Sequence, residues 1–308
     1  MKKLLDSIHI FLLGVITFFV QSCINDDLSP CDFNVQLKIH YDPYHYIDPI
    51  TQAAQTERVN SLSVFIFDQE GLLMNRIDKN LSIESNELVM DILLEDPGVY
   101  QFVVWGNLDE DQYHISACEK QKSRIYNTTM QVKANENDLV PNRLSKLFYG
   151  ATPLTQIGLD HQQVLEMTLE KFSTDIHIIL NGIEKEKQPS FLIRRLSNIY
   201  YFNNTYVHDR LLSYFPENTD SSAPDHIITG SFTLVKLRNT SNADFTIYTD
   251  NNRTAIYQAD LIEELINRFK ALDFNTNHTF TIEFIFNETN TPVSIKVNGW
   301  EITEEVEQ

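Results

Sequence analysis

The sequence predicts a mainly β protein made of antiparallel β-sandwiches. Short segments with alternating apolar and polar residues recur along the chain, and Gly, Pro, Asn and Asp residues typical of turns separate them. No long helical period occurs before residue 150. The 308 residues, of which 42% are hydrophobic and 22% charged, are ordinary for a globular chain and sufficient for two domains.

Residues 1–22 have the pattern of an export signal that ends at a cysteine. Lys2 and Lys3 precede an apolar run over residues 8–20, which is too short to cross a hydrocarbon core of about 30 Å as a helix. The run closes in Val-Gln-Ser-Cys, which resembles a bacterial lipobox ending at Cys23. We expect cleavage before Cys23, acylation of this residue and stable attachment to membrane lipid. The alternative is an ordinary secretory signal followed by an incidental cysteine.

A polar, acidic tether at residues 23–31 leads to the first strand, expected at residues 33–41 because apolar and polar residues alternate there. A long polar loop over residues 42–60 follows and contains Arg58. With the later strands, this series is assigned to a first sandwich domain at residues 32–152. The later strands are expected at residues 62–68, 72–77, 88–94, 99–105, 130–134 and 144–149.

A junction near residues 150–162 precedes a second series of strands, assigned to a domain at residues 153–308. One helix interrupts this series, because apolar residues recur at helical spacing over residues 261–269. Asp260 and Glu263 resemble a capping box at the start of this helix. The strands are expected at residues 164–172, 175–180, 191–202, 228–237, 245–248, 279–286 and 293–303.

Composition and motifs argue against several classes of function. A net charge of −19 disfavours binding to nucleic acid. The sequence contains no nucleophile elbow, zinc-protease motif, phosphate-binding loop or dinucleotide fingerprint, and its nine His residues lack the spacing of metal ligands. Acidic clusters at residues 109–111 and 250–252 lack the ligand pattern of a calcium loop. We therefore expect no enzyme, no cofactor, no metal site and no small-molecule substrate.

Two cysteines, Cys31 and Cys118, are left once Cys23 is assigned to lipid. An even pair in an exported protein predicts a disulfide bond between them. The sequence does not fix whether the two Cα atoms come within bridging distance, so two separate thiols are the alternative.

Several short motifs, taken in order, resemble the fimbrial anchor-subunit family of Bacteroidota, the Mfa-like and FimB-like lipoproteins of type V pili. They are residues 27–31 (Asp-Leu-Ser-Pro-Cys), 64–71, 105–107 (Trp-Gly-Asn), 147–150 (Leu-Phe-Tyr-Gly) and 295–300. The resemblance covers nearly the whole chain. It implies two tandem transthyretin-like sandwiches, and it implies that Asp26 and Asp27 after the lipidated cysteine act as a surface-export signal.

The resemblance also implies a structural role, in which a lipid-anchored subunit holds a pilus shaft to the outer membrane. In this family, an Arg-specific protease removes the first strand of shaft subunits, and a C-terminal strand of one subunit fills the resulting groove in the next. Arg58 is placed where such a cut is chemically conceivable, but a cut there would release Cys23 and its lipid from the rest of the protein unless a Cys31–Cys118 disulfide retained the fragment. We therefore expect an anchor to stay uncut.

By exclusion, contact with a fimbrial shaft subunit is expected from the C-terminal strand, through Val293, Ile295, Val297 and Trp300. The alternative function is a surface glycan-binding lipoprotein. That role requires an exposed aromatic platform, for which Trp105 and Trp300 are the two tryptophans available.

Replacing the lipobox cysteine tests the anchoring prediction. The Cys23→Ala variant should not be acylated, so the protein should move from the outer-membrane fraction to soluble fractions. Metabolic labelling with palmitate measures this, and unchanged labelling of the variant would contradict the lipobox assignment.

Overall fold

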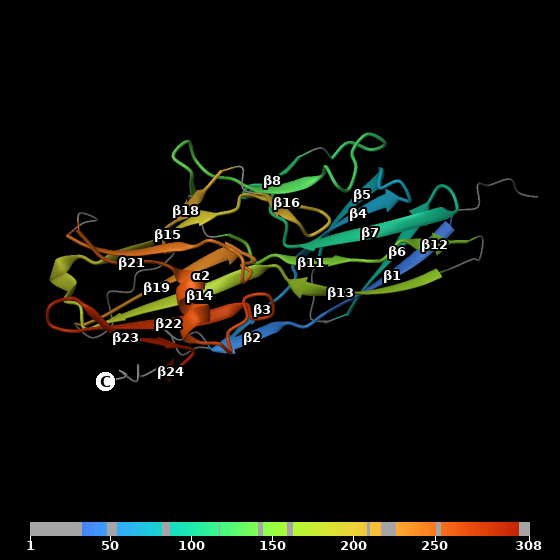
Figure 1. Cartoon of the computed structure of the whole chain (residues 1–308). Helices are drawn as coiled ribbons and strands as arrows, with labels where there is room; N and C mark the ends of the chain where they lie inside the picture. Colours follow the sequence, from blue (N-terminus) through green and yellow to red (C-terminus); the bar gives the residue numbers. More distant parts are fainter. Residues whose placement is uncertain are drawn as a thin grey trace, which may run out of the picture.

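The computed structural model describes nine segments of the chain and confirms a mainly β fold built of sandwiches. Figure 1 shows an elongated molecule with the early strands at one end, and the late strands and the helix α2 at the other. No helix within the described segments is long and apolar enough to span a membrane. The described segments are residues 33–47, 54–81, 87–116, 118–140, 144–158, 163–207, 210–216, 226–250 and 254–301.

An eight-stranded sheet forms the first end of the molecule, in the order β5-β4-β7-β11-β13-β1-β6, with β12 pairing to β7. Its neighbours are antiparallel except for β1 and β13, which are parallel. A hairpin of β2 (Tyr44–Ile47) and β3 (Ala54–Glu57) follows β1. The strands of the sheet are β1 (Phe33–Tyr41), β4 (Ser61–Asp68), β5 (Leu73–Asn80), β6 (Glu87–Leu94), β7 (Gly98–Gly106), β11 (Phe148–Ala151), β12 (Thr155–Ile157) and β13 (Gln163–Lys171).

Strand β4 is buried on both of its faces. Val64 and Ile66 pack in one core with β1, β6 and β13, whereas Phe65 and Phe67 pack in a second core on the opposite face. This explains why residues 64–67 form a continuous apolar run instead of an alternating one. The β4–β7 layer therefore lies between two other layers.

The outer layer joins the two halves of the chain through backbone hydrogen bonds. Two early strands, β8 and β9, form a four-stranded sheet with two late strands in the order β17-β16-β9-β8. The early strand β10 (Leu139–Val140) likewise pairs with the late strand β18 (Leu212–Tyr214). The strands of the four-stranded sheet are β8 (Tyr113–Ser116), β9 (Thr129–Val132), β16 (Ile199–Tyr201) and β17 (Tyr206–Val207).

The far end of the molecule is a sandwich of two five-stranded sheets, β10-β18-β15-β20-β21 and β19-β14-β22-β23-β24. Aromatic residues fill its core, and Phe245 stacks on Phe284 at a centroid distance of 5.3 Å. Its remaining elements are β14 (Ser173–Asn181), η1 (Lys185–Lys187), β15 (Ser190–Leu196), β19 (Ile227–Val235), β20 (Asp244–Thr249), β21 (Thr254–Asp260), β22 (Thr279–Phe286), β23 (Pro292–Val297) and β24 (Trp300–Glu301).

The predicted helix is present as α2 (Leu261–Arg268). The Asp260 carboxylate accepts hydrogen bonds from the backbone N–H groups of Ile262 and Glu263, both at 3.1 Å, so Asp260 caps the helix as expected. Leu261, Ile262 and Leu265 are buried, which makes this helix a cover for the second sandwich.

Four predicted elements differ from the structure. The single strand expected at residues 293–303 is divided into β23 and β24, which pair antiparallel with each other. Residues 42–60, expected to be loop, contain the β2–β3 hairpin. The single strand expected at residues 191–202 is divided between β15 and β16, which belong to different sheets. Residues 144–147 are not strand, so β11 begins at Phe148. Alternation of residue types identifies extended chain but does not show where the chain changes sheet.

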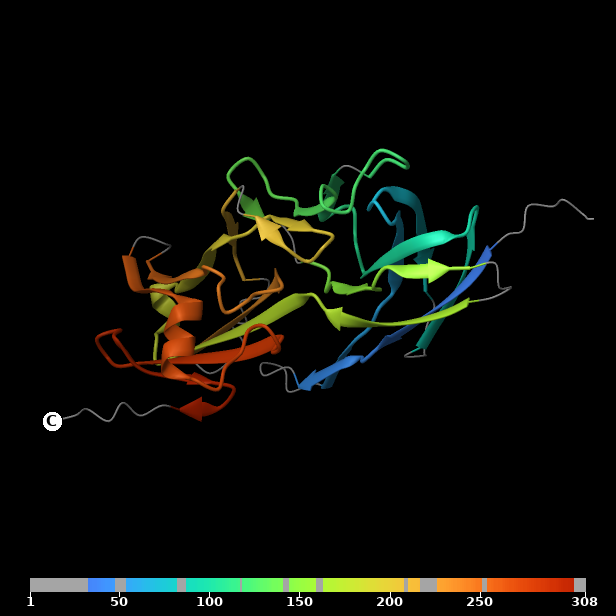
Figure 2. The same ribbon diagram turned by 45° about the vertical axis from the view of Figure 1, so that its right-hand side comes forward.

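The division of the chain at residue 152 stays a prediction, but strand pairing crosses that position. Strands β12 and β13 follow residue 152 and pair with β7, β11 and β1. Figure 2 shows β13 and β14 following one another along the length of the molecule, so the chain passes between the two ends near Phe172.

Candidate functional site

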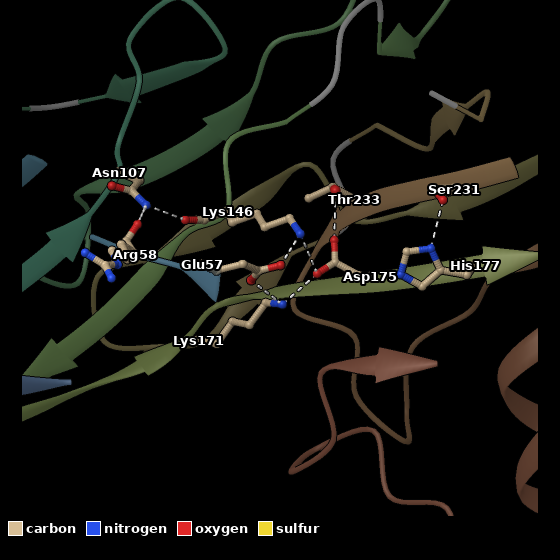
Figure 3. A network of polar contacts seen from close by, with 9 residues as sticks. All are labelled: Glu57, Arg58, Asn107, Lys146, Lys171, Asp175, His177, Ser231 and Thr233. Carbon is tan, nitrogen blue, oxygen red and sulfur yellow. Dashed lines mark hydrogen bonds and ion pairs between the residues drawn. The ribbon is translucent and has the colours of Figure 1, made fainter. Parts of the chain in front are cut away.

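Four charged side chains meet where β13 ends and β14 begins (Figure 3). Glu57 is the last residue of β3, and Lys171 is the last residue of β13. Asp175 lies near the start of β14, and Lys146 lies in the segment before β11. We call these four residues the junction cluster. They come from three stretches of the chain, because Lys171 and Asp175 lie on the continuous segment that joins β13 to β14. The cluster therefore fastens the hairpin to the point where the two ends of the molecule join.

The geometry of the junction cluster pairs every charge. The Lys171 Nζ lies 2.6 Å from Asp175 Oδ2 and 2.7 Å from Glu57 Oε2. The Lys146 Nζ lies 3.2 Å from Asp175 Oδ2 and also contacts Glu57 Oε1. Thr233 Oγ1 donates a 2.8 Å hydrogen bond to Asp175 Oδ1. Two cations and two anions leave the cluster with no net charge.

Burial makes these ion pairs mutually dependent. The side chains of Lys171 and Asp175 are each 3% exposed, and that of Glu57 is 7% exposed. Burial alone would raise the pKa of Asp175, but Lys171 and Lys146 and the hydrogen bonds to it hold that pKa below its ordinary value. A charge left unpaired in such surroundings is strongly destabilising. The cluster is therefore suited to holding structure and not to proton transfer.

Asn107 holds the backbone at Arg58 and on the C-terminal side of Arg58. Its Nδ2 donates to the carbonyl oxygens of Arg58 at 2.9 Å and of Lys146 at 3.0 Å. Its Oδ1 accepts a 2.7 Å hydrogen bond from the backbone N–H of Asn60. The backbone of Asn107 has a φ of 59°, which Asn adopts more readily than most residues. Figure 3 shows the Arg58 side chain directed away from the junction cluster.

The other two residues of the Trp-Gly-Asn motif, Trp105 and Gly106, are explained by how they pack. Val59 is 1% exposed, and a Cβ on Gly106 would lie 3.0 Å from its Cγ1, so a side chain at this position would crowd Val59. Trp105 is fully buried, with ring centroids 4.9 Å from Tyr149 and 5.0 Å from Phe172. Trp105 is therefore part of the core and not an exposed aromatic platform.

A polar cleft of about 490 Å³ lies beside the junction cluster, between the segment around Arg58 and the segments that follow β7 and precede β11. The side chains around it are hydrogen-bonding or charged, apart from Leu144. They come from Thr56, Glu57, Arg58, Asn60, Ser61, Asn107, Asp109, Gln112, Leu144, Ser145 and Lys146. No group of potential metal ligands occurs within the segments that the structure describes.

Of the three cysteines whose roles were predicted, the structure describes one. Cys23 and Cys31 lie outside the described residues. Cys118 is half-buried and carries a free thiol here; burial raises the pKa of this thiol, against the opposing effect of nearby Arg76. Acylation of Cys23 and a disulfide between Cys31 and Cys118 stay predictions.

The predicted C-terminal contact residues lie mainly on β23. Ile295 and Val297 are 5% and 1% exposed, because β23 pairs with β22 and packs in the second sandwich. Val293 is 60% exposed. Trp300 is the first residue of β24, and its backbone pairs with Val297. Its side chain is not among those that the structure describes. Their role in partner contact stays a prediction.

The sequence did not identify the junction cluster. The available signal was an aspartate inside the apolar strand at residues 173–180, together with a lysine that ends the alternating strand before it. Unpaired charges are rarely fully buried, so Asp175 and Lys171 imply partners. The partners Glu57 and Lys146 lie in segments whose positions only the tertiary fold determines.

Comparisons with known proteins match this chain to fimbrial proteins. The sequence model of a family described as fimbrillin-A associated anchor proteins Mfa1 and Mfa2 matches residues 28–306. The minor fimbrium anchoring subunit Mfa2 of Porphyromonas gingivalis is 22% identical over 301 residues, covering 89% of this chain and 90% of that protein.

Two solved structures have the same fold. The fimbrial anchor protein Mfa2 from Porphyromonas gingivalis is similar with a TM-score of 0.71 at 18% identity, covering 87% of this chain and 99% of that one. A Bacteroides thetaiotaomicron protein described as a putative polysaccharide binding protein has a TM-score of 0.72 at 19% identity, covering 88% and 99%.

Removing one cation from the junction cluster tests its role. Lys171→Met keeps the length of the side chain but leaves Glu57 and Asp175 with too little positive charge, so it should lower the free energy of unfolding by about 3–5 kcal/mol. Urea unfolding measures the change. Lys122→Met, at an exposed ion pair with Glu119, is the matched control and should leave stability unchanged. Equal stability of the two variants would contradict the role assigned to the cluster.

Proposed function

Because the chain belongs to the family of fimbrillin-A associated anchor proteins Mfa1 and Mfa2, we propose that it is the subunit that anchors a fimbrium to the outer membrane. The family consists of structural proteins of fimbriae. In this proposal, acylated Cys23 holds the protein in the outer membrane, and the folded body binds a fimbrial shaft subunit. Neither role requires catalysis, a cofactor or a small-molecule substrate.

An anchor of this kind must keep the segment that carries the lipid attached to its body. Strand β1 follows that segment and lies inside the eight-stranded sheet, paired with β6 on one side and β13 on the other. Val35, Leu37 and Ile39 of β1 are fully buried in the core. Pulling the lipid end away would therefore require breaking two strand ladders at once.

The observation that carries the proposal is the immobilised backbone around Arg58. Glu57 is buried in the junction cluster, Val59 is buried in the core, and Asn107 binds the backbone of Arg58 and Asn60. A protease must hold several residues around the cut bond in an extended form, so a segment bound at each residue resists cleavage. We propose that the Arg58–Val59 bond stays intact and that the first sandwich keeps β1.

The shaft contact is proposed at the edge formed by β23 and β24. Main-chain hydrogen bonds to an added strand would supply affinity there, and side chains such as Val293 would supply specificity. Donating β23 to a partner would instead expose Ile295 and Val297, which are buried against their own sheet. The burial of these two residues supports pairing at the edge over release of the whole strand.

A glycan-binding function has weaker support. One structural relative is described as a putative polysaccharide binding protein, at 19% identity. Such a function requires an exposed aromatic platform, and Trp105 cannot contribute to one because it is fully buried.

Cleavage by an arginine-specific protease under native conditions tests the immobilised segment. Asn107→Gly tolerates the positive φ but removes the amide, so cleavage after Arg58 should accelerate roughly ten- to hundredfold through easier local opening. Asn298→Gly is the matched control, because Asn298 also has a positive φ and accepts a backbone hydrogen bond, from Thr281. Mass spectrometry of the fragments gives the rate. Rapid cleavage of the unmodified protein after Arg58 would argue against this proposal.

A charge placed on the proposed shaft contact tests the partner surface. Val293→Lys should fold normally because Val293 is exposed, but it should release fimbriae from cells into the medium. Leu154→Lys, at a residue 55% exposed in the first half of the chain, is the control and should retain them. Immunoblotting of cell and medium fractions for shaft protein measures the outcome. Full retention by a well-exported Val293→Lys variant would move the contact elsewhere.

A further inference from the structure

Strand β6 is an unusually apolar edge strand. It is the last strand of the eight-stranded sheet, and within the described residues it pairs with β1 alone. The opposite edge strand, β5, carries Arg76, Asp78 and Lys79, which are the charged residues that natural sheets use to block pairing with other chains. Strand β6 reads Glu-Leu-Val-Met-Asp-Ile-Leu-Leu and has only one charge within its central six residues.

One face of β6 is buried in the core and the other is exposed. Its even-numbered residues from Leu88 to Leu94 are buried in the core of the first sandwich. On the outer face, Val89 is 45% exposed and Leu93 is 58% exposed, with the exposed Asp91 between them. Gln36 of β1 donates a 3.2 Å hydrogen bond to the Asp91 carboxylate and so holds it beside the edge. The exposed face therefore alternates apolar, acidic and apolar.

This pattern opposes pairing with a second copy of the chain. An antiparallel pair of β6 strands that sets Val89 opposite Leu93 also sets Asp91 opposite Asp91. A register with Val89 opposite Val89 brings Asp91 opposite Glu87, and one with Leu93 opposite Leu93 brings it opposite Glu95. Like charges directly opposite one another destabilise a strand pair. Every register that joins the apolar residues thus also opposes two acids.

We propose that the outer edge of β6 binds an extended segment of a different protein, with apolar residues opposite Val89 and Leu93 and a lysine or arginine opposite Asp91. Main-chain hydrogen bonds supply the affinity of such strand addition, and the alternating side chains select the partner. The net charge of −19 favours a basic partner segment in general. Asp91 determines which position of that segment must carry the positive charge. This surface is separate from the β23–β24 edge and does not depend on the identity of a shaft subunit.

Synthetic peptides test the proposal on the full chain. The probe is Lys-Thr-Val-Thr-Lys-Thr-Val-Thr-Lys, capped at both ends, and the control replaces each Lys with Glu. Hydrogen exchange should show that the basic peptide protects backbone amides of β6 between Val89 and Leu94, while the acidic peptide does not. A basic peptide N-methylated at alternate residues loses the donors needed for strand pairing and should give no protection.

A charge reversal on the protein supplies the matching arm. Asp91→Lys is at an exposed position, so the variant should fold normally. It should bind the basic peptide roughly five- to tenfold more weakly and gain binding of the acidic one. The proposal is overturned if the basic peptide protects no β6 amide, if the N-methylated peptide binds equally well, or if Asp91→Lys changes neither affinity. It is also overturned if the protein sediments as a dimer that Leu93→Lys dissociates, because a second copy would then occupy the edge.

Discussion

The buried pairing of Lys146 and Lys171 with Glu57 and Asp175 is the constraint on which the junction depends. Desolvated charges are tolerated only when each has its counter-charge in place, so the three stretches that carry these four residues must come together. One of these stretches ends the hairpin that precedes Arg58. Lys171 is the last residue of β13 in the eight-stranded sheet, and Asp175 lies on β14, which belongs to a sheet of the second sandwich. The same interaction thus aligns the two ends of the molecule and fixes the segment on which the proposed retention of the first strand depends.

The rest of the architecture reinforces this arrangement. Early strands pair with late strands in the outer layer, and one apolar core extends from Trp105 through Phe172 into the second sandwich. The two ends therefore share both backbone hydrogen bonds and packing. In the proposed anchor, such a body would carry load from a lipid end before β1 to a contact on the far sandwich, because β13 and β14 are separated by Phe172 alone.

The sequence was sufficient for the fold class and for strands with a clear period. The alternation of apolar and polar residues predicted β1, and the helical spacing of apolar residues after Asp260 predicted the helix, because these signals are local. The hairpin within residues 42–60 and the division of residues 191–202 between two sheets depend on tertiary pairing, which leaves no periodic trace. The junction cluster was missed for the same reason, since Glu57 is far from Lys171 and Asp175 in the sequence and only the tertiary fold brings it to them. The Trp-Gly-Asn motif was noticed, but its role at Arg58 required the geometry of Asn107.

We propose that the lipid-bearing strand remains covalently part of the folded body on the cell surface. Intact-mass measurement of the protein extracted from outer membranes, with disulfides reduced, tests this most directly. We expect a single chain that begins at acylated Cys23 and continues unbroken past Arg58. A chain that begins at Val59, accompanied by a separate lipidated fragment, would contradict it.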